Sequence, residues 1–155
     1  MDITFAPQGI VEISDARIVY RNFRGEAGKF NREGDRNFSV VIPNQEIADA
    51  LINEGWNVKI KPPREEGDEP FMVLPVKVKF NAKGPRVYLV TGERHNKLDE
   101  ESINCLDNID ILSVDLIIRP YDWEVNGKTG RTAYLQSIQV VQDVDNISAR
   151  FEEIN

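Results

Sequence analysis

Alternating apolar and polar residues dominate the C-terminal half of the chain and predict long β-strands. The longest such stretch covers residues 114–141 and reads VDLIIRPYDWEVNGKTGRTAYLQSIQVV. Asn126 and Gly127 divide it into two runs rich in β-branched and aromatic residues, and this pair accepts the positive φ angles of a tight turn. The pattern therefore predicts a long β-hairpin around which the rest of the chain is organised.

The first part of the chain predicts two strands separated by an irregular segment. Residues 9–20 alternate and predict a long strand, with a bulge near Ser14 and Asp15. Residues 37–42, NFSVVI, predict a short apolar strand. Residues 21–35 contain three glycines and no periodicity, so they are expected to form a loop.

A helix and further strands are expected in the middle of the chain. Asn44 is placed to cap a helix through Glu54, with Gly55 as its stop. Strands are predicted at residues 56–61, 71–80 and 86–91, the last two forming a second hairpin through the turn 81–85. Residues 62–70 and 92–97 are expected as loops, and residues 99–106 as a short helix.

These elements predict a mainly β fold with about seven strands and two short helices. Five longer, mostly antiparallel strands could close an OB-like barrel, that is, an oligonucleotide-binding barrel, with the second helix between its third and fourth strands. The first helix would then be an insertion, and the additional strands an extra hairpin. A β-sandwich with helical covers is the alternative.

Composition and charge narrow the class of protein. The 155 residues fit one domain, and 41% hydrophobic residues are enough for a core. The net charge of −7 argues against coating nucleic acid by charge alone, so any phosphate binding needs a local basic surface. A single Cys, no apolar run of about 20 residues and no signal-peptide pattern predict a soluble intracellular protein.

Enzyme chemistry finds no support in the residue pattern. His95 and Cys105 are the only residues of their types, which gives neither a nucleophile with its base nor a metal cluster. Asp122 and Glu124 share a strand face, but Asp115 points the other way, so the carboxylates of a two-metal nuclease do not converge. The sequence predicts a non-enzymatic protein without metal or cofactor.

A local basic surface is present in and around the irregular segment. Between Arg17 and Phe38 there are six cations and three anions, a net charge of +3 in a chain of −7, together with several aromatic rings. We interpret this segment as a flexible flap that closes over a nucleic-acid strand, since cations neutralise phosphates and rings stack on bases. The alternative is a solvated loop whose Phe residues pack into the core. The candidate binding residues are Arg21, Phe23, Arg24, Lys29, Phe30, Arg32 and Arg36.

The long hairpin carries a second group of cations and rings. Aromatic residues near a hairpin commonly pack across strands, so at least one of them is expected in the core, as is Trp56 after the helix. The candidate binding residues here are Arg119, Tyr121, Trp123, Lys128, Arg131 and Tyr134.

Four segments resemble a family of bacteriophage early proteins that bind single-stranded DNA: YRNFRGEAGKFNREGDRNFSV, EGWNVK, DEP and VDLIIRPYDWEVNGKTG. The likeness runs from about Gly9 to Val141. It implies an OB-like fold and sequence-tolerant binding of unpaired DNA during replication or recombination. Residues 142–155 carry a charge of −3 and resemble the acidic tails with which such proteins hold replication partners, although the terminal Phe of the bacterial type is missing.

The sequence therefore predicts one DNA-binding domain at residues 1–141 and an acidic tail at residues 142–155. The alternative is a protein-interaction or DNA-mimicking module with an acidic working surface. The expected partners are single-stranded DNA, replication or recombination proteins held by the tail, and a second copy paired through an edge strand such as residues 71–80. The expected location is the cytoplasm of an infected or lysogenic bacterial host.

Overall fold

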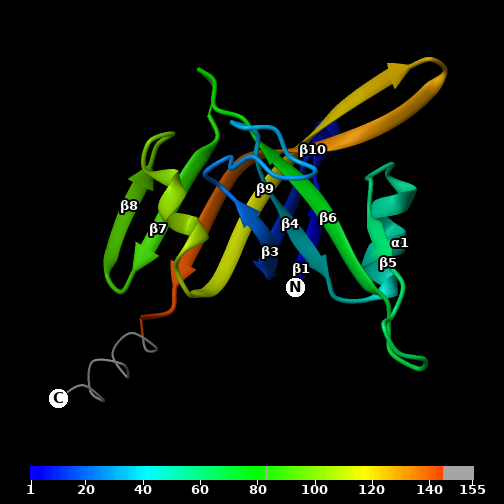
Figure 1. Ribbon diagram of the computed structural model, residues 1–155, viewed down its shortest axis with the longest axis horizontal. Coiled ribbons are helices and arrows are strands. Elements are labelled where there is room, and N and C mark those ends of the chain that lie inside the picture. Colours follow the sequence, from blue (N-terminus) through cyan, green and yellow to red (C-terminus); the bar gives the residue numbers. More distant parts are fainter. Residues whose placement is uncertain (83, 145–155) are drawn as a thin grey trace.

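The computed structural model describes residues 1–82 and 84–144 and places ten strands in one sheet (Figure 1). The strands are β1 (Asp2–Phe5), β2 (Val11–Ala16), β3 (Ile18–Asn22), β4 (Arg36–Ile42), β5 (Lys59–Lys61), β6 (Phe71–Val78), β7 (Arg86–Thr91), β8 (Arg94–Leu98), β9 (Ile111–Val125) and β10 (Lys128–Gln142). Within residues 1–82 and 84–144 the named helical elements are α1 (Gln45–Asn53) and two 3-10 turns, η1 (Pro7–Gly9) and η2 (Ile103–Asp107).

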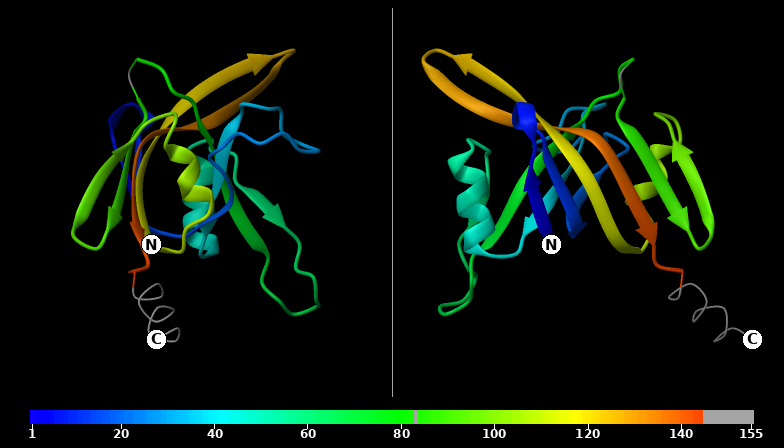
Figure 2. Two further views of the ribbon diagram at one scale, coloured as in Figure 1. Left: turned by 60° about the vertical axis from the view of Figure 1, so that its left-hand side comes forward. Right: turned by 180° about the vertical axis from the view of Figure 1, so that it is seen from behind.

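The sheet is large, mixed and strongly twisted (Figure 2). Its strands follow the order β1-β2-β9-β10-β6-β4-β3, with β5 paired to β6, and with β7 paired to β10 and β8. Most pairs are antiparallel, but β10 runs parallel to both β6 and β7. The mainly β class is confirmed, and the strand order is that of an open sheet. Because all ten strands belong to one sheet, the alternative of two packed sheets does not describe this fold.

The predicted bulge in the first long strand is confirmed. The pairing of β2 with β9 shifts between Ile13 and Ala16, and Asp15 has a φ of 51°. Such a bulge bends the strand. As a result β2 pairs with β9, whereas β3, which follows after Arg17, pairs with β4 at the other end of the strand order.

The predicted long hairpin is also confirmed, as β9 and β10 pair along nearly their whole length. Asn126 and Gly127 turn the chain with φ angles of 52° and 79°, the left-handed region that this pair accepts. The outer part of the hairpin projects from the body as an arm (Figure 1).

The helix α1 has the predicted ends. The side chain of Asn44 accepts a hydrogen bond from the backbone N–H of Ile47 at 2.9 Å, and Gly55 follows the helix with a φ of 91°. Ala48 and Leu51 are fully buried on its inner side. Trp56 is 3% exposed, which confirms that it belongs to the core.

The region after β6 differs from the prediction. Residues 81–85 do not close a hairpin, because β7 pairs with β10 and with β8, and residues 94–98 form strand β8 where a loop was expected. This edge strand has four exposed residues followed by a half-buried one, so it lacks the alternation by which strands are recognised. The second helix is a 3-10 turn, Ile103–Asp107, strand β5 covers only Lys59–Lys61, and β1 was not expected.

The core lies between the inner side of the sheet, α1 and η2. It contains residues from nearly every strand, among them Val11, Phe38, Val76, Ile118 and Val140, each 1% exposed or less. None of the helices in the described part of the chain is long and apolar enough to cross a membrane.

Candidate nucleic-acid interface

The outward-pointing residues of β4, β6 and β10 form one continuous surface, which we call the groove face. Asn37 pairs with Lys77, and Lys77 in turn pairs with Tyr134. Paired residues on neighbouring strands point to the same side of a sheet, whereas Phe38 and Val76, the next residues inward, are buried. A groove of about 700 Å³ runs over this face, between the loop that precedes β4 and the start of the long hairpin.

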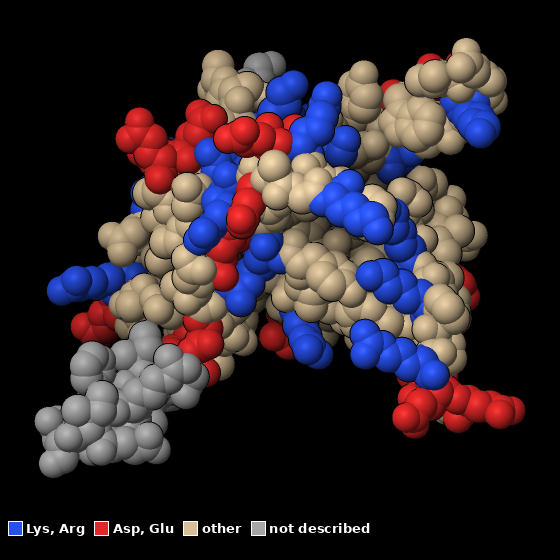
Figure 3. All heavy atoms as spheres, viewed as in Figure 1, with Lys and Arg blue, Asp and Glu red and all other residues tan. Residues whose placement is uncertain are grey.

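The groove is basic although the whole chain is acidic. Five cations line it against two anions, a local net charge of +3. Three aromatic residues also line it at or near the surface. The cations are Arg32, Arg36, Lys59, Lys77 and Lys79, the anions are Asp35 and Glu100, and the aromatic residues are Phe30, Phe80 and Tyr134. Lys and Arg atoms predominate in the middle and on the right of this side of the molecule, whereas acidic atoms gather at the upper left, in a strip left of the centre and at the lower right (Figure 3).

The hairpin continues the groove face with a row of rings. Tyr134 pairs with Arg119, whose guanidinium carbon lies 5.2 Å from the centre of the Tyr134 ring. Tyr121 meets the same ring edge to face at 6.0 Å and is 56% exposed. Arg119 and Tyr121 therefore share a face, as the sequence predicted, and Tyr134 connects them to the groove.

Trp123 lies against the neighbouring strand in a fixed position. It pairs with Gly130, and a Cβ atom added to that glycine would come within 2.3 Å of the indole Cζ2. The indole Nε1 donates a hydrogen bond to Thr132 Oγ1 at 3.2 Å. An aromatic ring packed over a cross-strand glycine is a common way to stabilise a sheet. Here it holds a ring that is still 38% exposed on the hairpin.

The opposite face of the hairpin has a structural role. Arg131 donates two hydrogen bonds to the Asp122 carboxylate, at 2.7 and 3.1 Å, and its guanidinium carbon lies 5.4 Å from the Trp56 ring centre. The hydrogen bond from Arg131 lowers the pKa of Asp122, which keeps that carboxylate charged. The charge of Arg131 is thus matched by an acid, on the side away from Trp123. Lys128 is exposed near the turn and pairs with Val125.

We call residues 23–35, between β3 and β4, the basic loop, and we call the point where it leaves β3 its root. The root is attached to η2. Asp107 accepts hydrogen bonds from the backbone N–H groups of Phe23 and Arg24, at 2.8 and 3.0 Å, and pairs with the Arg24 side chain at 3.2 Å. Arg21 donates to the carbonyls of Leu106 and Ile109 at 2.7 and 2.8 Å. These contacts occupy two of the cations that the sequence analysis assigned to DNA.

Phe23 and Arg36 also take part in the structure of the loop. Phe23 is fully buried and stacks on Phe38 with ring centres 5.1 Å apart, so its ring offers no surface to a base in this conformation. Arg36 donates to the carbonyl of Phe23 and, at 2.8 Å, to Asn104 Oδ1. Its guanidinium carbon also lies 5.9 Å from the Phe80 ring centre, and its side chain lines the groove.

The exposed candidate binding residues of the loop lie at its tip, around Phe30. Phe30 is 94% exposed, and the Lys29 ammonium lies 5.5 Å from its ring centre. Arg32 is exposed and pairs with Asp35 at 3.4 Å. The side-chain amide of Asn31 organises this tip, because its nitrogen shares two N–H groups among three carbonyl oxygens, those of residues 26, 32 and 35, at 2.9 to 3.0 Å.

Several groove residues escaped the sequence analysis. Lys77 lies near the end of β6, and Lys79 and Phe80 follow directly after it. The two lysines are two positions apart, the spacing of one face of a strand. Lys59 comes from the short strand β5. The alternation of lysine and valine, which predicts a strand here, is also the signal that marks one side of β6 as basic.

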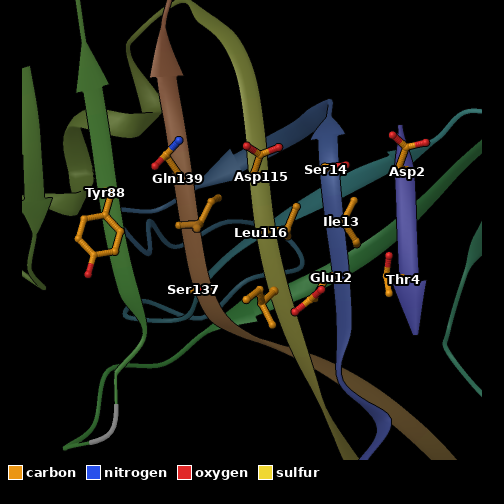
Figure 4. A pocket seen from close by; sticks show the side chains of 12 residues that line it. Asp2, Thr4, Glu12, Ile13, Ser14, Tyr88, Asp115, Leu116, Ser137 and Gln139 are labelled. Atoms are coloured by element: carbon orange, nitrogen blue, oxygen red, sulfur yellow. The ribbon is translucent and has the colours of Figure 1, made fainter. Parts of the chain in front are cut away.

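A second concavity, of about 430 Å³, lies elsewhere on the sheet and shares none of the groove's lining residues (Figure 4). Asp2, Glu12 and Asp115 line it together with Tyr88 and Gln139, and no Lys or Arg is among its lining residues. In residues 1–82 and 84–144, no three His, Cys, Asp or Glu side chains gather as a metal site.

A curved sheet with an exposed surface of cations and rings is typical of proteins that bind single-stranded nucleic acids. The chain belongs to the family described as "Putative phage ssDNA-binding domain", whose model matches residues 4–155. This confirms the resemblance found in the sequence. The family is one of DNA-binding domains, in agreement with the prediction of a non-enzymatic protein.

Solved structures of the single-stranded DNA-binding protein from bacteriophage Enc34 share the fold. That protein matches with a TM-score of 0.60 and 16% identity, over 91% of this chain and 85% of the other. Its complex with single-stranded DNA matches with a TM-score of 0.59, and its C-terminal truncation with 0.55, each at 18% identity over 91% of this chain and 90% of the other. No curated protein matches the sequence.

Proposed function

We propose that this protein binds single-stranded DNA in the groove over β4 and β6, without enzymatic activity. The observation that carries the proposal is the net charge of +3 in a ring-lined groove on a chain of −7. The family and the DNA complex of the Enc34 protein support it.

The pairing of the strands supports an OB-like arrangement for this interface. We infer that β2 and β3 act as two halves of one bent strand, because only Arg17 separates them. The path from β3 through β4, β6, β10 and β9 then returns to β2. A five-stranded path of this kind, with one parallel pair, is that of an OB barrel. The basic loop and the long hairpin are the connections that flank its binding face.

The chemistry of the groove favours binding that tolerates any sequence. Lys59, Lys77 and Lys79 would neutralise phosphates, which are the same in every nucleotide. Phe30, Tyr121 and Trp123 would stack on bases, and a stack contributes about 1–3 kcal/mol whichever base takes part. Rings and cations therefore supply affinity in two separable ways.

A titration with oligo-dT at several salt concentrations tests this proposal. Wild-type protein should bind, and log affinity should fall with log salt by roughly 0.7 per phosphate contact. Lys77→Ala should lower that slope by about 0.7 without unfolding the protein. Lys97→Ala is the matched control, because Lys97 is exposed on β8, pairs with Tyr88 of the acidic concavity and does not line the groove.

The same titration distinguishes DNA binding from the alternative function. A protein-interaction or DNA-mimicking module would show no binding to oligo-dT even at low salt and no quenching of Trp fluorescence. If Lys77→Ala and Lys97→Ala change the salt slope equally, the groove is not the binding surface.

We further propose the wider role that the sequence suggests. The DNA-binding domain would end near residue 141, and the acidic tail at residues 142–155, mostly outside the described residues, would hold replication or recombination proteins in the cytoplasm of a phage-infected or lysogenic host. Without DNA, the tail would compete for the groove, so its deletion should tighten binding at low salt. Unchanged affinity after the deletion would rule out this competition between the tail and DNA. Residues 71–80 are not the edge strand that the sequence predicted, because β6 pairs with β4, β5 and β10. A homodimer would have to pair through a strand at an end of the order, such as β1 or β3, and would appear in a sedimentation measurement.

A further inference from the structure

Tyr20 has a backbone conformation that bulky residues rarely adopt. Its φ is 53°, and the pairing of β3 with β4 shifts between Val19 and Asn22 on either side of it. Residues held in this left-handed region cost conformational energy and are found mainly where the surrounding structure imposes them, often at functional sites. The conformation of Tyr20 therefore calls for a reason in its surroundings.

The Tyr20 side chain takes part in a cluster formed by three strands. The ring is 55% exposed. The Lys61 ammonium of β5 lies 4.4 Å from its centre and donates a hydrogen bond to its hydroxyl at 2.9 Å. Phe71 at the start of β6 meets the ring edge to face, with centres 6.4 Å apart and planes at 89°, and is itself 36% exposed. The bulge thus places an aromatic ring beside a cation at the surface.

Strand register places this cluster on the groove face. Phe71 and Lys77 are six positions apart on β6, so both point to the same side. Lys61 pairs with Phe71, and Lys59, which lines the groove, pairs with Val73. Six residues of strand span about 20 Å, which is the distance along β6 from Lys77 to the cluster. Blue atoms continue in that direction down the right side of the face (Figure 3).

We propose that Tyr20, Lys61 and Phe71 form a second stacking site, reached by a single strand that leaves the groove past Lys59. This inference rests on the proposed function. An unpaired base lies on the exposed side of the Tyr20 ring, and Lys61 neutralises the neighbouring phosphate. The site takes nucleotides beyond those that fill the groove, so its contribution depends on the length of the DNA.

Binding of dT oligomers of increasing length tests the second site. The variant Tyr20→Asn removes the ring and keeps a residue type that tolerates the left-handed region. Oligomers that fill only the groove should bind the variant and the wild type alike. Longer oligomers should bind the variant about 5- to 150-fold more weakly, the range expected for the loss of one stack. Tyr88→Asn, the same change at the acidic concavity, should leave binding unchanged at every length.

Two further measurements test the second site through its charge and check that the variants are folded. Lys61→Met should lower the salt slope by about 0.7 for long oligomers only, and thermal melting should show that each variant is folded. Equal affinity of Tyr20→Asn and the wild type at all lengths would overturn the second site. Equal weakening at all lengths would also overturn it, because Tyr20 would then belong to the groove. If the wild type binds no oligomer, the proposed function itself fails.

Discussion

A methyl group at Gly130 should displace Trp123 without disturbing the fold. The added Cβ would lie 2.3 Å from the indole Cζ2, whereas ordinary contacts begin at 3.4 Å, so the ring must move by at least about 1 Å. The backbone accepts the change, because Gly130 is not among the glycines with positive φ. Alanine in a strand also gains roughly 0.5–1 kcal/mol over glycine, which offsets part of the lost packing.

The expected result of Gly130→Ala is weaker DNA binding at nearly unchanged stability. If Trp123 stacks on a base, loss of its position removes about 1–3 kcal/mol, and 1.4 kcal/mol corresponds to a tenfold weaker affinity. Acrylamide quenching should show a more accessible Trp123, since the other tryptophan, Trp56, is buried.

A double-mutant cycle decides whether the effect passes through the ring. Trp123→Ala alone should weaken binding about as much as Gly130→Ala, and the double variant should show little further loss. Additive losses would mean that Gly130 acts independently of the ring. Full affinity of Trp123→Ala would refute the stacking role of the hairpin.

Three further predictions concern the basic loop. Phe23→Ala should destabilise the fold by about 3–5 kcal/mol, as truncation of a buried Phe does, whereas Phe30→Ala should leave the melting temperature unchanged and weaken oligo-dT binding about 5- to 150-fold; the opposite pattern would reverse their roles. Asn31→Ala removes the side-chain amide that bridges three carbonyls of the tip and accepts a hydrogen bond from Asn37, so hydrogen exchange of the loop amides should quicken and affinity fall without a change in salt slope. Asp107→Ala leaves two backbone N–H groups at the root without their acceptor, so chemical denaturation should show a loss of roughly 1–3 kcal/mol or more, and unchanged stability would show that the root is not held there.

Local signals in the sequence were sufficient for the elements whose geometry is set by neighbouring residues. The turn at Asn126 and Gly127, the helix cap at Asn44 and the bulge at Asp15 were all predicted. Strand β8 was missed, because an edge strand with mostly exposed residues has no apolar periodicity. The partners of β7 were also missed, since its pairing with β10 joins residues about fifty positions apart.

The candidate interface was predicted as a region more successfully than residue by residue. Phe23 and Phe30 occur in the same basic loop, yet one is fully buried and the other 94% exposed. What separates them is the contact of the loop root with η2, more than eighty positions along the chain. Lys59 and Lys77 were not predicted as binding residues, because the apolar pattern of their strands indicates core residues and not the surface that the strands form together. Their meeting in one groove follows from strand register, which sequence alone did not supply.

The hydrogen bonds of Asn31 have a consequence for the energetics of association. In a flexible loop, the loss of backbone entropy would cost about 1–2 kcal/mol for each residue ordered on binding. Here the side-chain amide, together with the backbone bonds between Gly28 and Asn31, holds the segment around Phe30 in shape before any ligand arrives. These bonds define the shape of the loop around Phe30, which lowers the ordering cost that the protein bears on association.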